Sequence, residues 1–131
     1  MKINPIRGTH DIFGQEIEKF NKIIRAVKQI ADQFNFHELV TPIFEDTNLF
    51  KKPLGEQSDV VLKEMYTFQD RNAEYITLRP EYTTPMIRAA ISNGLLNTLP
   101  AKFFGIGQMF RRERPQKGRY RQFNQINFEN F

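Results

Sequence analysis

AKFFGIGQMFRRERPQKGRYRQFNQINFENF, residues 101–131, contains two apolar-rich segments on either side of a run of basic residues. Ala101 to Glu113 and Gln122 to Phe131 have the aromatic content and the spacing of strands. The basic residues between them form the connection. This stretch therefore predicts a hairpin of two long antiparallel strands, on which the rest of the chain packs.

Strand periodicity predicts which side chains of this hairpin lie together. Residues two apart point to the same face, so Met109, Arg111 and Glu113 share one face of the first strand. On the return strand, one face carries an aromatic ring, two amides and a carboxylate: Phe123, Gln125, Asn127 and Glu129. Ile126 and Phe128 point to the other, core-like face. A sheet that served stability alone would not normally gather the polar set, so we expect a site there.

The net charge of +4, from 19 basic and 15 acidic residues, is concentrated at the same hairpin. Between Arg111 and Arg121 the single acid is Glu113, and the basic residues are Arg111, Arg112, Arg114, Lys117, Arg119 and Arg121. Such a cluster indicates a partner that carries phosphate, either a nucleotide or a nucleic acid. Exposed hairpins also use charge for solubility and edge protection, and charge alone does not separate these roles.

The side chains of the polar face fit the activation of a carboxylate by a nucleotide. Arg111 can hold an α-phosphate through two hydrogen bonds and offset the charge that grows at phosphorus. Phe123 offers a flat surface for a base, and the loop arginines, among them Arg119, can reach the outer phosphates. Glu129 and Gln125 present oxygen acceptors for an ammonium group.

The remaining sequence predicts an α+β domain, with helices packed on an antiparallel sheet. Apolar residues at steps of three and four predict a helix over 15–34, which Asn35 ends as a left-handed cap. A strand over 36–40 runs into Thr41 and Pro42, and because Pro cannot donate to a ladder, this strand should lie at an edge or interface. The other expected elements are a short helix over 46–52 that stops before Pro53, a hairpin of 65–68 with 74–79, and a helix over 83–93.

Composition narrows the class of protein. A chain of 131 residues with 40% hydrophobic content and thirteen Phe forms one domain or part of one, and is not of a disordered type. No apolar run approaches the ~18–20 residues that cross a bilayer. The absence of Cys excludes disulfides and thiolate metal sites and suits the cytoplasm. Two histidines, His10 and His37, are too few for a His-based metal centre.

Residues 110–123, FRRERPQKGRYRQF, resemble motif 2 of the class II aminoacyl-tRNA synthetases, in the form typical of histidyl-tRNA synthetases. Further segments resemble the same family: Arg7-Gly8-Thr9-His10-Asp11, Lys63-Glu64-Met65-Tyr66-Thr67-Phe68 and Leu78-Arg79-Pro80-Glu81-Tyr82-Thr83. Pro42 stands where the motif 1 proline of the dimer interface belongs. The resemblance implies that residues 1–131 are the N-terminal portion of a class II catalytic domain. It places motif 3 and the anticodon-binding domain outside these residues, so we expect the isolated chain to be inactive.

Carried over by position, the resemblance implies a histidine–tRNA ligase, which activates histidine with ATP to histidyl-adenylate and transfers it to tRNA(His). The residues expected to contact histidine are Glu81, Tyr82, Thr83, Arg111, Gln125 and Glu129. Those expected to contact ATP are Arg111, Glu113, Arg119 and Phe123. Arg111 is the expected catalytic residue, because it would bridge the α-phosphate and the histidine carboxylate. ATP also implies Mg²⁺, whose ligands the sequence does not identify.

Two positions depart from the family pattern. Tyr82 stands where Gly commonly follows the Pro-Glu pair, and Ile126-Asn127-Phe128 replaces a small, Gly-containing stretch, so bulk is expected to crowd the histidine pocket. The family further implies a cytoplasmic homodimer that associates near Pro42. Two alternatives stay open: the regulatory subunit of ATP phosphoribosyltransferase, which resembles the synthetase catalytic domain, and a basic RNA-binding module.

Overall fold

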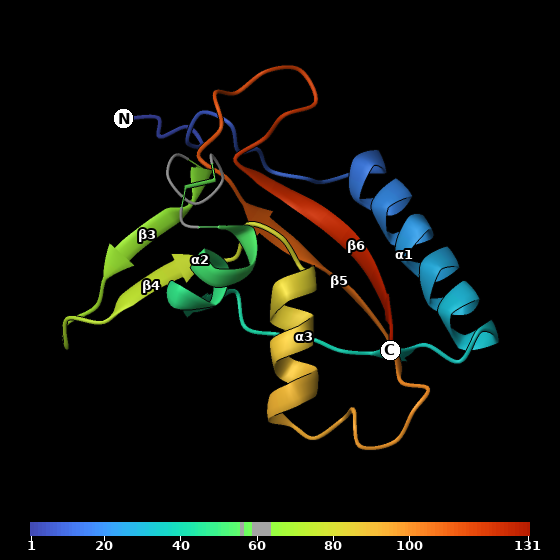
Figure 1. The fold of residues 1–131 in the computed structure, drawn as a ribbon. Helices are drawn as coiled ribbons and strands as arrows, with labels where there is room; N and C mark the ends of the chain where they lie inside the picture. Colours follow the sequence, from blue (N-terminus) through green and yellow to red (C-terminus); the bar gives the residue numbers. More distant parts are fainter. Residues whose placement is uncertain (56, 59–63) are drawn as a thin grey trace.

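The structure, a computed structural model, describes residues 1–55, 57–58 and 64–131 (Figure 1). Lys63, which begins one of the family-like segments, lies outside the described residues. The described residues form three helices: α1 (Gln15–Gln33), α2 (Asn48–Leu54) and α3 (Thr83–Ser92). They also form six strands: β1 (His37–Glu38), β2 (Phe44–Asp46), β3 (Tyr66–Gln69), β4 (Tyr75–Leu78), β5 (Lys102–Phe110) and β6 (Gln122–Asn130). The α+β class is confirmed.

The first sheet contains the predicted long hairpin and has the strand order β1-β5-β6. β5 and β6 have nine residues each and pair antiparallel in one register, from Lys102 opposite Asn130 to Phe110 opposite Gln122. β1 pairs with β5 in the parallel direction. The hairpin is therefore confirmed, and the sheet that it belongs to is mixed.

Two predicted strands of this sheet are longer than the observed ones. The strand expected to reach residue 113 ends at Phe110. At that point the Arg112 N–H donates to the carbonyl of Glu64 at 2.6 Å and not to β6. The strand expected over 36–40 is reduced to β1, which lies at the edge of the described sheet as the proline argument predicts.

The second sheet is antiparallel and has the order β2-β4-β3. Its β3–β4 hairpin confirms the prediction for residues 65–79. β2 was not predicted, because three residues without clear alternation give no strand signal. The wholly buried Thr77 in β4 joins the sheet through its hydroxyl, which bonds to the hydroxyls of Thr47 at 2.8 Å and Thr67 at 3.0 Å.

α1 confirms the predicted first helix and the way it ends. Asn35 adopts a left-handed φ of 58°. The N–H groups of Asn35 and Phe36 donate to the carbonyls of Asp32 and Ala31 at 3.2 and 2.8 Å, which is the bonding of a Schellman motif. Ala31 is buried, whereas Ile30 on the apolar face remains exposed. The apolar face of α1 is thus incompletely covered by the described residues.

α2 differs from its prediction. A helix over 46–52 was expected to stop before Pro53, whereas α2 contains Pro53 as its last residue but one. Proline removes one backbone donor. The missing donor lies in the last turn of a short helix, and the wholly buried Phe50 anchors this helix to the rest of the fold.

α3 confirms the helix predicted over 83–93 and covers the face of β5 and β6 that carries Phe123. Tyr82, Met86 and Met109 are wholly buried and form one cluster, against which Phe123 packs. Because Tyr82 and Met86 come from the start of α3 and Met109 from β5, the cluster holds the N-terminal end of α3 against the hairpin.

Candidate functional site

Arg111 is the first residue after β5. Its backbone N–H donates to the carbonyl of Arg121 at 2.9 Å and extends the β5–β6 pairing by one step. The guanidinium Cζ lies 5.1 Å from the centroid of the Phe123 ring. Its Nε donates to the carbonyl of Pro80 at 2.9 Å. The side chain is therefore fixed between the hairpin and the segment that precedes α3.

Glu113 turns back toward the same guanidinium. One oxygen of its carboxylate lies 3.8 Å from a terminal nitrogen of Arg111, and the two side chains are 19% and 29% exposed. Stacking on Phe123 and pairing with Glu113 hold the plane of the guanidinium, the geometry that two-pronged binding of a phosphate or carboxylate requires.

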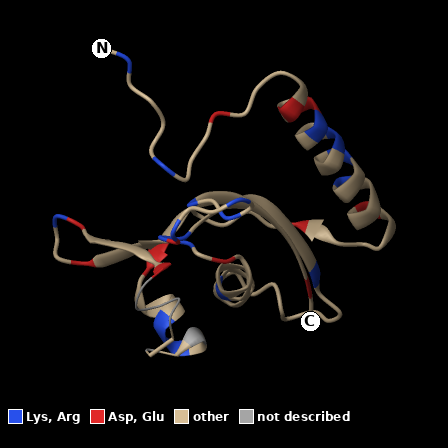
Figure 2. Ribbon diagram, turned by 90° about the horizontal axis from the view of Figure 1, so that it is seen from above, with Lys and Arg blue, Asp and Glu red and all other residues tan. Residues whose placement is uncertain are grey.

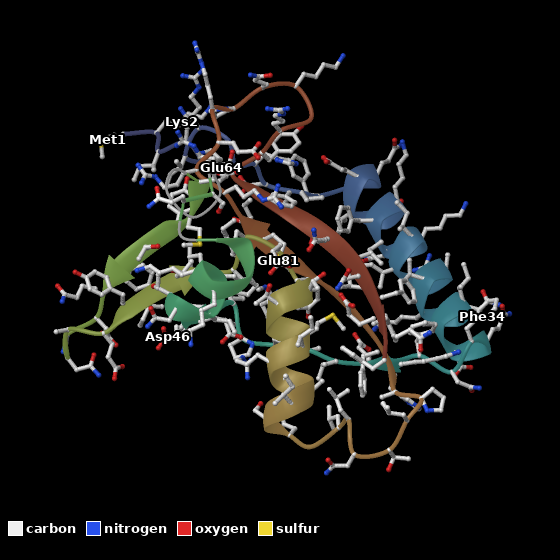
Figure 3. All side chains as sticks on the ribbon, in the orientation of Figure 1. Met1, Lys2, Phe34, Asp46, Glu64 and Glu81 are labelled. Carbon is white, nitrogen blue, oxygen red and sulfur yellow. The ribbon has the colours of Figure 1, made fainter. Side chains whose placement is uncertain are left out.

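Two acceptors lie at the N-terminal end of α3, where Figure 3 labels Glu81. The two oxygens of the Glu81 carboxylate accept from the Thr84 N–H at 3.0 and 3.2 Å, so Glu81 caps the helix. The side-chain oxygen of Gln125 accepts from the Tyr82 N–H at 2.8 Å. β6 and the start of α3 are thus joined directly at the site.

Glu129 reaches the same helix end through another residue. Asn127 donates from its side-chain nitrogen to Glu129 at 2.8 Å and contacts the Thr83 hydroxyl at 3.3 Å. Thr83 is the first residue of α3. The carboxylate of Glu129 is therefore held near the start of α3 by Asn127.

The grouping of side chains predicted from strand periodicity is confirmed, but the prediction that Ile126 and Phe128 lie on the core-like face is wrong. These two residues are 41% and 40% exposed, whereas the buried cluster of Tyr82, Met86 and Met109 lies on the face of Phe123. Arg111, Phe123, Gln125 and Glu129 all lie on the side of the first sheet that faces α3. Along β6 the residues of this face are partly buried, whereas Asn124, Ile126 and Phe128 on the opposite face are exposed. The roles of these residues toward ligands stay predictions.

The ring of Tyr82 packs against β5 on this same face, within the buried cluster that Phe123 contacts. This ring is wholly buried beneath β5 and occupies the space that a Cβ at Gly105 would need. Its hydroxyl donates to the carbonyl of Leu39 at 3.2 Å. Toward Gln125, Tyr82 donates its backbone N–H, and the expected crowding of the histidine pocket by its ring stays a prediction.

Phe128 lies on the other face of the sheet from the predicted histidine pocket. Its ring stacks on Phe104 with centroids 5.8 Å apart and meets the edge of Phe36 at 5.0 Å. Phe104 and Phe128 are cross-strand partners in β5 and β6. The bulk of Phe128 therefore packs on the opposite side of the sheet.

The connection between β5 and β6 projects beyond the ends of the two strands (Figure 1), and its Lys and Arg residues are blue in Figure 2, where it is seen from above. Gln116 and Arg119 bond to each other through their backbones at 2.9 and 3.3 Å, around a turn in which Gly118 has a φ of 77°. The Arg119 side chain is exposed, and no contact between described residues joins it to the Arg111–Phe123 pair. Arg119 thus belongs to the loop rather than to the fixed site.

Arg79 was missed by the sequence analysis. It is 3% exposed, and it donates from Nε to the carbonyl of Gln108 at 2.8 Å and from Nη1 to the carbonyl of Thr41 at 2.9 Å. It joins the segment of Thr41 and Pro42 to β5. Its position in the family-like segment 78–83 indicated that it matters. Its burial was not predicted, because a charged residue at the end of a strand is normally exposed.

No metal site is apparent among the residues that the structure describes, since no group of three or more His, Asp or Glu side chains is placed to hold an ion. Mg²⁺ therefore stays a prediction. No helix in the described part of the chain has the length and apolar composition to cross a bilayer.

The arrangement can bind a molecule that carries both an anionic and a cationic group. Arg111, stacked on Phe123, offers a fixed positive charge and an aromatic surface. The carboxylates and the amide at the start of α3 offer acceptors for an ammonium group. An amino acid beside a nucleotide has this distribution of charge.

Comparisons with known proteins agree with this chemistry. The family model described as tRNA synthetase class II core domain (G, H, P, S and T) matches residues 66–131. A histidine–tRNA ligase of Gluconobacter oxydans (strain 621H) is 53% identical over 127 residues, which are 97% of this chain and 31% of that protein. The crystal structure of apo S. aureus histidyl-tRNA synthetase aligns with a TM-score of 0.79 and 34% identity, over 97% of this chain and 28% of the other.

A more distant structure shares the fold alone. An ATP phosphoribosyltransferase regulatory subunit/histidyl-tRNA synthetase from Bacillus halodurans aligns with a TM-score of 0.79 at 18% identity, over 99% of this chain and 32% of that chain. The chain thus spans about a third of the length of the proteins that it matches. The family match covers more than half of the residues, and the chain belongs to the class II tRNA synthetase core domain family.

Proposed function

We propose that the chain forms the histidine- and ATP-binding part of the active site of a histidine–tRNA ligase. The observation that carries this proposal is the Arg111 guanidinium, stacked on Phe123 beside the acceptors at the start of α3. The 53% identity to the Gluconobacter protein supports histidine as the amino acid.

Arg111 has the central role in the proposed reaction. One carboxylate oxygen of histidine attacks the α-phosphorus of ATP, and the bond from that phosphorus to the pyrophosphate oxygen breaks as the new bond forms. Arg111 binds the carboxylate and the α-phosphate together and offsets the charge that develops at phosphorus. The histidyl group then passes to a ribose hydroxyl of tRNA(His), and AMP leaves.

The other site residues divide between the two substrates. Phe123 stacks on the adenine ring, Glu113 accepts from its amino group, and Arg119 in the basic loop approaches the distal phosphates. Around the α-amino group of histidine the proposed acceptors are Glu81, Thr83, Gln125 and Glu129, with Tyr82 contributing through its backbone. Mg²⁺ accompanies ATP in this proposal.

We also propose that the ligase is a cytoplasmic homodimer that associates around Thr41 and Pro42. Apolar residues flank this segment, and Val40, Ile43 and Phe44 are 71%, 42% and 58% exposed. Apolar surface of this kind, gathered around one short segment, is typical of a protein–protein contact.

Titration calorimetry of the chain with ATP and with histidine tests the proposal. Arg111→Ala is expected to weaken ATP binding by about tenfold or more, because a charge-assisted contact is lost. Lys117→Ala, which removes the same charge from the exposed part of the loop, is the matched control and should have a smaller effect. The isolated chain should not catalyse ATP–pyrophosphate exchange, and robust exchange would contradict our assignment of the active site.

The alternatives give other results in the same experiment. A regulatory subunit would bind histidine without ATP. An RNA-binding module would bind RNA with a steep dependence on salt, and ATP would not compete. A chain that binds both ATP and histidine, and whose ATP binding is weakened in Arg111→Ala, is distinguished from both alternatives.

A further inference from the structure

Asn127 lies between Glu129 and the first residue of α3, and no contact with a ligand is assigned to it above. Its side-chain nitrogen is 2.8 Å from an oxygen of Glu129, 3.3 Å from the hydroxyl of Thr83 and 3.4 Å from the sulfur of Met86. An amide nitrogen has two hydrogens. The shortest contact is with the carboxylate, and a hydrogen bond to a charged acceptor is the strongest of the three.

This hydrogen bond determines how Glu129 is presented. With one carboxylate oxygen engaged by Asn127, the other oxygen is left to accept from a ligand. Among the described residues, Asn127 is the donor that contacts this carboxylate. Without it, Glu129 would be free to rotate about its side-chain bonds, and ordering it would cost binding free energy.

The cross-strand neighbours of Asn127 and Glu129 offer no substitute donor. Across the strand pair, Asn127 faces Gly105 and Glu129 faces Phe103, and neither carries a polar side chain. The charged groups on this side of the sheet include Glu81, which caps α3, and Arg111, which is bound to Pro80. They also include Arg79 beside Gly107, which is bound to the carbonyls of Gln108 and Thr41. Arg88, in α3, is paired with Glu45 of β2.

We propose that Asn127 is a positioning residue of the histidine site, which fixes Glu129 and ties it to the first residue of α3. The inference rests on the proposed function, because Glu129 must bind the ligand for its orientation to matter.

A double-mutant cycle on histidine affinity tests the inference. Asn127→Leu has a similar shape without the donor, and it should weaken histidine binding about tenfold. In the Glu129→Ala background the same substitution should change affinity less than about twofold, because the acceptor through which Asn127 acts is gone. Asn127→Asp, of equal size and also without the amide donor, is the second variant and should weaken binding at least as much.

The control is Asn124→Leu, on the exposed face of the same strand, which should leave histidine affinity unchanged. Folding of every variant is checked by ¹⁵N-correlated NMR, and the same spectra report the side-chain amide of Asn127. Its resonances should move in Glu129→Ala and on addition of histidine to the wild-type chain.

The outcomes separate the inference from the proposed function. Equal effects of Asn127→Leu in both backgrounds would mark Asn127 as a packing residue and overturn the inference, while histidine binding stands. Asn127 amide resonances that do not move in Glu129→Ala would also overturn it. A wild-type chain that does not bind histidine would refute the proposed function and the positioning role together, even with the hydrogen bond visible in the spectra.

Discussion

The guanidinium of Arg79 lies over the ring of Tyr82, with Cζ 4.5 Å from the ring centroid. Arg79 is buried, and no carboxylate among the described residues pairs with it. Its charge is stabilised by backbone carbonyls and by the face of an aromatic ring. A Cβ at Gly107 would overlap its terminal nitrogen, so glycine in β5 gives the cation its space. The pair links residues 79–82 to the segment of Thr41 and Pro42.

Replacement of Arg79 is expected to destabilise the fold. Arg79→Met leaves the carbonyls of Thr41 and Gln108 without their donor, and a buried group left unpaired costs about 1–3 kcal/mol. The free energy of unfolding in urea should fall by about 3 kcal/mol for the two groups together. Arg25→Met, on the exposed side of α1, is the control and should change it by less than about 0.5 kcal/mol. A loss as small as that of the control would show that Arg79 does not join the segments.

Gly105 and Tyr82 are expected to be coupled. Gly105→Ala places a methyl group in the volume of the Tyr82 ring, and overpacking of this kind costs about 1–3 kcal/mol. Tyr82→Leu alone should also destabilise, because it removes core volume. The double variant should lose less than the sum of the two, which denaturation of all four proteins measures. Strict additivity would mean that the ring does not fill the space at Gly105.

The ion pair of Arg88 and Glu45 should contribute to stability, unlike the exposed ion pair of Lys28 and Glu38. The Arg88–Glu45 distance is 2.7 Å and the Glu45 side chain is 8% exposed, whereas Lys28 and Glu38, 3.6 Å apart, are 52% and 41% exposed. Arg88→Met leaves a buried carboxylate unpaired, so unfolding free energy should fall by about 2–3 kcal/mol. Lys28→Met should cost no more than about 0.5 kcal/mol.

Replacement of Asn35 by glycine is expected to stabilise the fold. Its φ of 58° is a conformation that glycine adopts without a Cβ penalty, so Asn35→Gly should stabilise by up to about 1 kcal/mol. Asn35→Val should destabilise by about 1–2 kcal/mol. Asn93, which ends α3 with a φ of −101°, is the matched control, and Asn93→Gly should bring no gain. Thermal unfolding distinguishes these results, and equal shifts at both asparagines would contradict the role of φ.

Much of the fold could be predicted because its main elements have long, regular patterns. The β5–β6 hairpin, α1 with its Asn35 cap, α3 and the β3–β4 hairpin each followed from local periodicity. β2 could not be predicted, since its three residues are defined by pairing with β4 and not by their own pattern. The early end of β5 depends on the contact of Arg112 with Glu64, which lies far away in the sequence.

The candidate site was predictable on the hairpin and less so around it. Strand alternation placed Arg111 and Phe123 on one face, and the structure stacks them. Alternation gives no information on the direction of Tyr82, which comes between a strand and a helix and enters the core because Gly105 leaves space there. Asn127 was placed on the correct face, but its bond to Glu129 depends on side-chain conformation, which a pattern does not specify.

The parallel pairing of β1 with β5, in which His37 lies opposite Phe103, has a consequence for synthesis on the ribosome. At roughly 5–20 residues per second, β1 leaves the exit tunnel several seconds before the strand that it pairs with. During that interval the apolar side of α1 and the edge of β1 have no native partner in the nascent chain. We therefore expect the emerging N-terminal third to be a substrate for chaperones, until β5 is available to close the sheet.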